Sequence, residues 1–285
     1  MNINLNEWDY SKPLIINDIE LETIILLKDY LAARGLPYLA EHKKAVDDPK
    51  KLKVQERLLV YHNGQPTGIG VREDVHINMS QHASVQFGFF TDDDYIVGQQ
   101  RHITKINGMC LDQTGAGHMK IPEELWSVEG YAKKFGYAYT EETKALLTSN
   151  YLQYLNSATF KRQSVLDEAG EETNTILLEG NLIYVGEATY RQVIQPENNK
   201  GVMYANNELA SAFAYRISYP QLQQIYMKDG EASAIFLMKT EKFFKAAKQD
   251  HVNMTEAYRQ GKPYDNIFVP RFPVYDVLFG GIQKN

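Results

Sequence analysis

The proline-free segment Thr140–Ala169 limits the folds open to this chain more than any other stretch. Thr140 is a suitable N-cap, Glu141 and Glu142 suit the first turn, and Gly170 is a suitable stop signal. From Glu141 the segment has 29 residues, which as one helix is about 43 Å long at 1.5 Å per residue. We therefore predict a single long helix, with its weakest point at Thr148-Ser149-Asn150.

The apolar residues of this segment recur at intervals of three or four, which predicts a helix that buries one side and exposes the other. The stripe expected to be buried comprises Leu147, Tyr151, Leu155, Ala158, Val165 and Ala169. The flank expected to face solvent carries Lys144, Gln153, Lys161 and Glu168.

The size and composition of the chain are those of an ordinary globular protein. It has 285 residues, of which 44% are hydrophobic, and its net charge is 30 − 36 = −6. This length supports a substantial core, and the acidic balance disfavours nucleic acid as a direct partner. With Cys110 as the one cysteine, an intramolecular disulfide is excluded, and the count argues against a cysteine-based zinc site.

The remaining segments predict an α+β fold in which the long helix packs on a mixed or antiparallel sheet. Residues 1–53 form an arm with helices at 19–34 and 37–46, and Asn63-Gly64 marks the turn of a projecting hairpin. Short strands follow up to residue 112. Four regions result, which a single domain can contain: 1–53, 54–112, 113–172 and a mixed α/β half at 173–285. In that half we predict helices near 206–216 and 220–228, and an extended tail over 264–281.

No segment has the features of a signal peptide or a bilayer-spanning helix, which favours synthesis in the cytoplasm and argues against a membrane partner. No glycine-rich stretch matches a nucleotide-binding motif, and we expect no cofactor.

Few residues stand out as metal ligands or catalytic groups. His76 and His82 lie on one face of an extended strand, about 20 Å apart, and meet only around a turn. Structural histidines are the simpler interpretation. Asp92, Asp93 and Asp94 are weak candidates for a cation site because adjacent strand residues alternate faces. They and the Tyr184/Arg191 region leave open a metal-dependent enzyme acting on nucleic acid or nucleotides.

Tyrosine is abundant, with 19 residues, and its large face with a polar tip suits contact surfaces. The hairpin tip and the tail are the candidate interface, and a basic helix face with spacing i, i+3, i+6 is a further surface. The candidate residues are Tyr61, His62, Asn63, Gly64, Tyr264, Phe268, Phe272 and Tyr275, with Lys242, Lys245 and Lys248 on the basic face.

The order of these elements resembles that of the HK97-type major capsid proteins of tailed phages. The shared pattern is an arm, a projecting hairpin, an aromatic lead-in at FGYAYTEE, a long helix ending in DEAG, and a mixed half. The resemblance implies a self-assembling, homo-oligomeric shell subunit of a virion, with no catalytic residues. Two alternatives remain: the nucleotide or nucleic-acid enzyme, and a partner-binding or inhibitor module.

Overall fold

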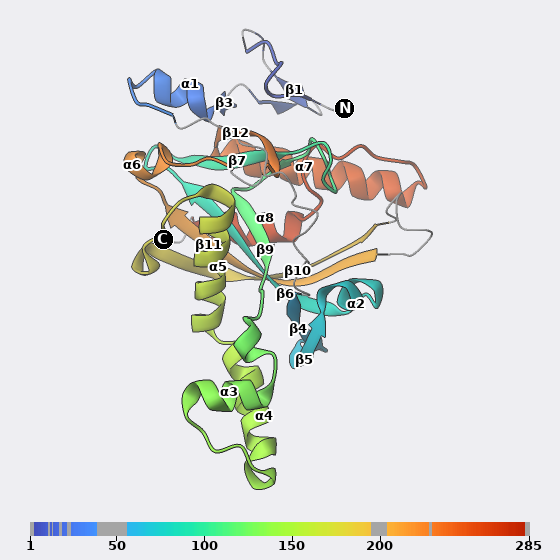
Figure 1. Cartoon of the computed structure of the whole chain (residues 1–285). Coiled ribbons are helices and arrows are strands. Elements are labelled where there is room, and N and C mark those ends of the chain that lie inside the picture. Colours follow the sequence, from blue (N-terminus) through green and yellow to red (C-terminus); the bar gives the residue numbers. More distant parts are fainter. Residues whose placement is uncertain are drawn as a thin grey trace.

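The computed structural model describes residues 3–10, 12, 14–16, 19–21, 24–38, 56–194, 204–227 and 230–282. The predicted α+β class is confirmed, because helices pack around one large mixed sheet (Figure 1). Its main path runs β10-β11-β6-β7-β12-β3, and β4, β5, β8 and β9 pair beside that path. The predicted helix at 37–46 lies outside the described residues.

The strands and helices have the following bounds. The strands are β1 Ile15–Ile16, β2 Ile19–Glu20, β3 Ile25–Leu26, β4 Arg57–His62, β5 Gln65–Val71, β6 Gln81–Phe90, β7 Tyr95–Arg101, β8 Leu111–Asp112, β9 Gly115–His118, β10 Leu182–Ile194, β11 Tyr204–Arg216 and β12 Ala232–Lys239. The helices are α1 Leu27–Ala32, α2 Arg72–Ile77, η1 Glu123–Leu125, α3 Val128–Phe135, α4 Glu141–Leu155, α5 Ala158–Thr173, η2 Glu179–Asn181, α6 Tyr219–Leu222, α7 Thr240–Arg259 and α8 Phe272–Ile282.

The predicted helix at 206–216 is wrong, because this segment is the sheet strand β11. Its residues alternate between two buried environments, as the period of a strand requires. Ala210 and Ala212 pack with Val274 and Leu278 of α8. Phe213, on the opposite face, belongs to the main core. The small alanines allow α8 to lie close to the sheet, so packing outweighs the helix propensity of alanine.

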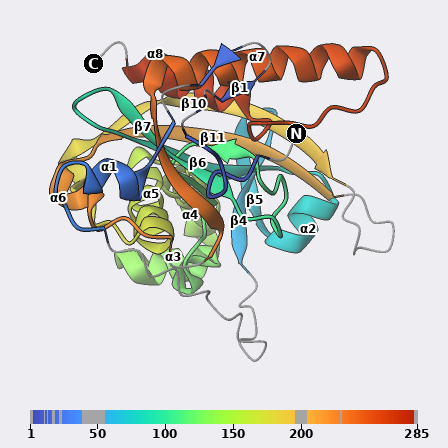
Figure 2. The same ribbon diagram turned by 90° about the horizontal axis from the view of Figure 1, so that it is seen from above.

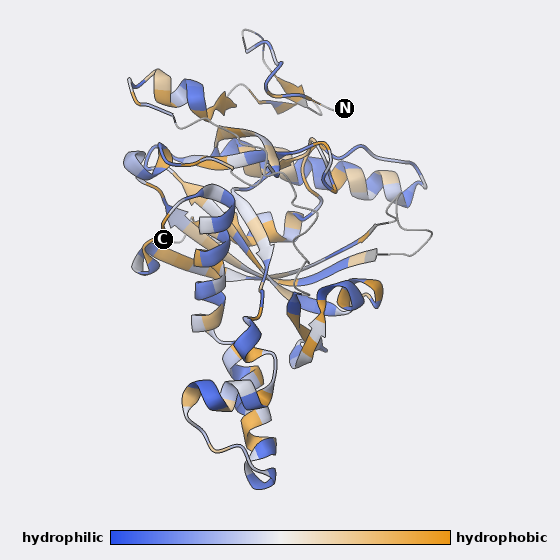
Figure 3. Cartoon of the chain, viewed as in Figure 1, coloured by the Kyte–Doolittle hydropathy of each residue, from blue (hydrophilic) through white to orange (hydrophobic). Residues whose placement is uncertain are grey.

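Helices cover both faces of the sheet (Figure 2). Helices α7 and α8 lie on one face, and the segment α3–α5 lies on the other. The prediction of an extended tail over 264–281 is therefore wrong from Phe272 onward. The apolar colouring gathers in the sheet and at the inner sides of the helices (Figure 3). None of the helices in the described ranges is both long and apolar enough to cross a membrane.

The predicted single helix over 140–169 is wrong, because the chain breaks between α4 and α5. Asn156 ends α4 with φ −91° and ψ 1°, and Ser157 is extended with φ −72° and ψ 155°. The Ser157 hydroxyl accepts a hydrogen bond from the amide of Phe160, so it caps the N-terminus of α5. The expected weak point at Thr148–Asn150 lies inside α4, and Gly170 lies inside α5, which continues to Thr173.

The hairpin β4–β5 is confirmed, with Arg57 paired to Val71 and His62 paired to Gln65. Its turn residues Asn63 and Gly64 have φ of 51° and 73°, the left-handed values that a type I′ turn requires. The predicted helix at 19–34 is largely wrong, because only Leu27–Ala32 of it is helical in the described residues.

Candidate active site and histidine cluster

A cavity of about 570 Å³ is lined by residues of α5, β9 and α2, among others. Its volume is in the range of small-molecule binding sites. The lining is dominated by charge of both signs: acidic residues Glu56, Glu168, Glu171, Glu172, Glu208 and Glu231, and basic residues Arg72, Arg101, Lys105, Lys120 and Arg271. Such a lining suits a polar, charged ligand.

Three of these acids come from one turn of α5. Glu168, Glu171 and Glu172 have the spacing i, i+3, i+4, which places them on the same helix face. Nζ of Lys120 lies 2.9 Å from Oε1 of Glu168 and 2.7 Å from Oε2 of Glu171. The amide of Ala116 donates to Oε2 of Glu172 over 3.2 Å. Strand β9 and the residues after it therefore hold this acidic wall in place.

Two glycines of β9 permit this close approach. A Cβ atom at Gly117 would lie 2.2 Å from the carboxylate of Glu168. A Cβ atom at Gly115 would lie 2.3 Å from Oε2 of Glu172. A larger residue at either position would displace a glutamate carboxylate, so glycine at 115 and 117 allows α5 to pack closely on β9.

Burial and charge shift the pKa values on this wall in opposing ways. Burial raises the pKa of Glu168, and the charge of Lys120 limits that rise. Burial works to lower the pKa of Lys120, but the carboxylates of Glu171 and Glu168 outweigh it and the pKa is raised. A cation is thus already favoured between these two acids, and carboxylate oxygens are the ligands that Mg²⁺ and Mn²⁺ prefer.

The lining of the cavity also carries arginine and lysine. Arg271 is 6% exposed, and its Nη1 donates to Oε1 of Gln86 over 2.5 Å. Its Nη2 lies 3.5 Å from Oδ2 of the buried Asp112, which also pairs with Arg101 at 3.6 Å. Lys105 pairs with Glu231. Arg271 is thus fixed in orientation from within the protein while it lines the cavity.

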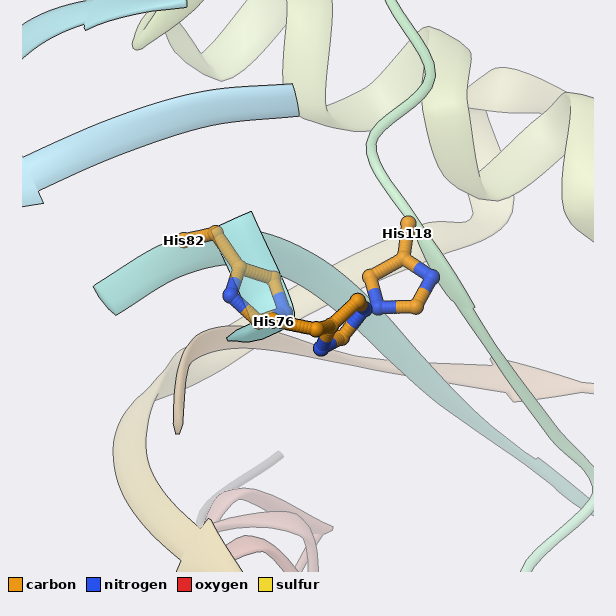
Figure 4. Close-up of side chains that lie close together, drawn as sticks. All are labelled: His76, His82 and His118. Carbon is orange, nitrogen blue, oxygen red and sulfur yellow. The ribbon is translucent and has the colours of Figure 1, made fainter. Parts of the chain in front are cut away.

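Three histidines form a cluster (Figure 4). His76 comes from α2, His82 from β6 and His118 from β9, and one nitrogen of each lies within 4.8 Å of the others. The ring centres of His76 and His82 are 4.7 Å apart, and those of His82 and His118 are 5.1 Å apart. His76 and His118 also line the cavity.

Backbone carbonyls fix the tautomers of two of these rings. Nδ1 of His76 lies 3.0 Å from the carbonyl oxygen of Ala205, and Nδ1 of His82 lies 3.0 Å from that of Ser80. Only a protonated nitrogen can donate to a carbonyl, so Nε2 of each neutral ring carries the lone pair. Burial lowers the pKa of all three, to about 4 for His76 and well below the usual value for His118.

The sequence predicts that His76 and His82 can meet only around a turn, and the structure has such a turn. Helix α2 ends at Ile77, and the chain reverses before β6 begins at Gln81. Met79 in this turn has φ 54°, a conformation that is uncommon for a residue other than glycine. The interpretation of these two residues as separate structural histidines is replaced by a three-ring cluster. The third member, His118, could not be assigned because it lies on a distant strand.

The acids of α5 were missed as well. Glu168 was placed on a solvated flank, but it is 6% exposed and lies against β9. Glu168, Glu171 and Glu172 share one helix face, a spacing visible in the sequence. What faces them depends on the pairing of β9 with β6, which no local pattern predicts.

The acidic triplet Asp92–Asp94 lies in the turn between β6 and β7, away from this cavity lining. Asp93 accepts a hydrogen bond from the hydroxyl of Tyr30 over 2.8 Å and pairs with Arg34 at 3.3 Å. Asp94 has φ 65°. Metal binding by this triplet stays a prediction.

The candidate interface residues are divided between surface and core. His62, Asn63 and Gly64 at the hairpin tip are exposed, and Tyr264 and Phe272 are partly exposed. Tyr61, Phe268 and Tyr275 are 5%, 2% and 2% exposed, so their side chains fill the core of this chain. Of the basic face on α7, Lys245 and Lys248 are exposed and Lys242 is partly exposed. Contact with a partner through the exposed members stays a prediction.

A scan against models of protein families finds no match. A search of curated protein sequences also finds none. Among solved structures, the chain is similar to DR0079 from Deinococcus radiodurans, with TM-score 0.38 and 12% identity over 68% of this chain and 90% of that one.

Two further solved structures are similar over part of their length. One is a MutT/nudix family protein from Enterococcus faecalis, with TM-score 0.29, 10% identity, and coverage of 55% of this chain and 43% of that one. The other is a bifunctional NMN adenylyltransferase/ADP ribose pyrophosphatase from Francisella tularensis complexed with AMP and a manganese ion, with TM-score 0.30, 13% identity, and coverage of 63% and 42%.

These findings correct the interpretation of the chain as a phage capsid or shell subunit. The long helix that supported the resemblance is broken at Asn156–Ser157. The two partly similar structures are a MutT/nudix family protein and a bifunctional adenylyltransferase/pyrophosphatase, not capsid proteins. The expectations of a virion location and of a chain without enzymatic activity fall with that interpretation.

Proposed function

We propose that this protein is a divalent-cation-dependent hydrolase that cleaves a phosphoanhydride bond in a nucleotide-type substrate. One observation carries the proposal: acids of a single helix turn and buried or half-buried cationic side chains line the same 570 Å³ cavity. An acidic wall holds a divalent cation, and the arginine and lysine groups bind the phosphate oxygens that the cation leaves exposed. Together the cation and these side chains would stabilise the negative charge that develops as a phosphoanhydride bond is cleaved.

The residues that would hold the cation are Glu168, Glu171 and Glu172. Their fit is supported by Lys120, whose ammonium group lies between two of these carboxylates and shows that the wall favours positive charge. A bound Mg²⁺ or Mn²⁺ supplies charge neutralisation and lowers the pKa of a coordinated water.

The protein's own groups orient the substrate. Arg271 is held by Gln86 and Asp112, so its guanidinium needs no reorganisation to receive a phosphate. In the reaction a water oxygen forms a bond to phosphorus, and the bridging P–O bond breaks. The water proton passes to a carboxylate of the cavity, and the leaving phosphate departs as an anion.

The test is a hydrolysis assay on the full chain with Mg²⁺ or Mn²⁺. The substrates are nucleoside triphosphates, dinucleoside polyphosphates and nucleoside diphosphate sugars including ADP-ribose, with products separated by chromatography. We expect cation-dependent release of a nucleoside monophosphate or phosphate from at least one class. The variants Glu171→Gln and Glu172→Gln should lose activity on the order of a hundredfold.

The matched control is Glu179→Gln, an exposed acid outside the cavity lining, which should retain full activity. Absence of hydrolysis across all substrates and both cations would overturn the proposal. So would hydrolysis that is unchanged in both Glu171→Gln and Glu172→Gln.

A further inference from the structure

The histidine cluster lies next to the acidic wall but has a different ligand chemistry. Imidazole nitrogens suit Zn²⁺, Co²⁺, Ni²⁺ and Cu²⁺, whereas carboxylates suit Mg²⁺ and Mn²⁺. We propose that His76, His82 and His118 form a second, separate site for a transition-metal ion of the Zn²⁺ class, with an open coordination position toward the cavity.

The geometry of the rings matches such a site. In a tetrahedral site with Zn–N bonds of about 2.0–2.1 Å, neighbouring imidazole ring centres lie roughly 5 Å apart. The three separations here are 4.7, 5.0 and 5.1 Å. One nitrogen of each ring already lies within 4.8 Å of one nitrogen in each of the other two, a separation that side-chain rotation can shorten to bonding distance.

The surroundings of the rings are those of metal-binding histidines. A ligating histidine usually donates its second ring N–H to a carbonyl or carboxylate, which fixes the lone pair toward the metal. Ala205 and Ser80 accept these bonds from His76 and His82. All three rings are kept neutral at pH 7 by burial, and neutral imidazole is the form that binds metal.

Two of the ring nitrogens are buried without a hydrogen-bond partner in the part of the chain that the structure describes. Nε2 of His82 and Nε2 of His118 are buried, and neither makes a hydrogen bond to the residues that the structure describes. His82 is fully buried. A buried polar atom without a partner is unfavourable, and it needs a function or an unseen partner. A metal ion shared by the three rings provides that partner.

The fourth coordination position has a defined direction. His76 and His118 line the cavity, and His82 is not among its lining residues. The position not taken by a ring therefore opens to the cavity, where water or an anionic oxygen of a ligand can bind. Three histidines with one open position is the arrangement of catalytic rather than structural zinc sites.

The nearby charges set the selectivity. Arg72 lowers the pKa of all three histidines by its positive charge, and its Nη1 lies 2.6 Å from Oε2 of Glu56. Glu208 acts in the opposite direction on His76. A hard cation held mainly by charge gains little here, whereas a metal that forms strong bonds to nitrogen tolerates the arginine.

The test is a Co²⁺ titration of the metal-free full chain, followed by visible absorption. We expect one equivalent to give the intense bands of tetrahedral Co²⁺, and Zn²⁺ to abolish them. His82→Gln and His118→Gln should each weaken binding at least about tenfold. His62→Gln, on the exposed hairpin tip, should leave it unchanged. Thermal melts of the metal-free variants establish that they fold, and ¹⁵N shifts of the imidazole nitrogens on adding Zn²⁺ test the wild-type chain directly.

Failure of this site and failure of the hydrolase are distinguishable. Glu171→Gln should lower hydrolysis about a hundredfold and leave the Co²⁺ bands intact. Absence of tetrahedral bands and of imidazole shifts would overturn the proposal. Bands that persist in folded His82→Gln and His118→Gln, or that vanish in Glu171→Gln, would also overturn it.

Discussion

Nζ of Lys120 lies 2.9 Å from Oε1 of Glu168, so an ammonium group neutralises a buried acid at the position where a divalent cation would bind. The lysine and the metal therefore compete for the same carboxylates. We expect Lys120→Met to raise the affinity for Mn²⁺ several-fold, because two carboxylates lose their internal counter-ion. Calorimetric titration with Mn²⁺ measures the effect.

The control for this variant is Lys134→Met. Lys134 pairs with Glu124 at 3.1 Å on the surface and lies outside the cavity lining, so its loss should leave Mn²⁺ affinity unchanged. Weaker Mn²⁺ binding in Lys120→Met would instead show that the lysine orients the acids for the metal.

Gly117→Ala is expected to abolish activity while leaving the chain folded. The new Cβ atom would lie 2.2 Å from the carboxylate of Glu168, so this side chain must move out of the acidic wall. The measurement is the rate of nucleotide hydrolysis together with a thermal melt. Retention of full activity would mean that the position of Glu168 is not critical.

Gly170→Ala is the matched substitution on the facing helix, and it should have the opposite effect on stability. Gly170 lies inside α5, and a Cβ atom there meets nothing within 4 Å. Alanine in a helix interior is favoured over glycine by about 0.5–1 kcal/mol. Urea unfolding should show a gain of that size with unchanged hydrolysis, and a loss of stability would indicate a contact at this position.

The sequence carried clear signals for some local elements but not for the elements that pack against them. The Asn63-Gly64 turn and the Thr140 cap were predicted because their signals are carried by adjacent residues. The break at Asn156–Ser157 was missed because the apolar spacing of α4 continues almost in phase into α5. Only the cap of Ser157 on Phe160 distinguishes two helices from one.

The candidate site was harder to predict because it is built by long-range pairing. His118 reaches His82 because β9 pairs with β6, with Ser84 opposite His118. The acids of α5 face the same strand. Neither the reversal at Met79 nor this strand pairing has a strong local signal, so nothing in the sequence linked the three histidines to one another or to the glutamates of α5.

Asp250 is expected to be important for the stability of the segment before α8. Its Oδ2 accepts hydrogen bonds from the amides of Ile267 and Phe268 at 3.1 and 3.0 Å, and its Oδ1 accepts one from the hydroxyl of Tyr264 at 2.7 Å. Asp250→Ala removes the acceptor from these donors, at a cost of about 2–4 kcal/mol in the free energy of unfolding. Urea denaturation measures the cost.

The control for Asp250 is Asp276→Ala, a substitution of the same type at an exposed position of α8. It should cost well under half as much. Equal losses in the two variants would show that the bonds of Asp250 contribute little beyond the local chain.

Cys110 should be unreactive in the folded protein over the whole neutral pH range. Burial, followed by the charges of Asp250 and Asp112, raises the pKa of its thiol to about 12 from a usual value of 9.0. Only the thiolate reacts with alkylating reagents, so at pH 8 the folded chain presents very little of the reactive form. Because the folded pKa lies above the unfolded one, this thiol favours folding below pH 9 and loses that contribution as the pH rises toward 12.

Iodoacetamide labelling at pH 8, followed by mass spectrometry, should therefore be slow in buffer and should accelerate at the urea concentration at which the chain unfolds. Rapid labelling of the folded chain would show that the segment around Cys110, whose Sγ contacts the carbonyl oxygen of Asn266 at 3.2 Å, opens without global unfolding.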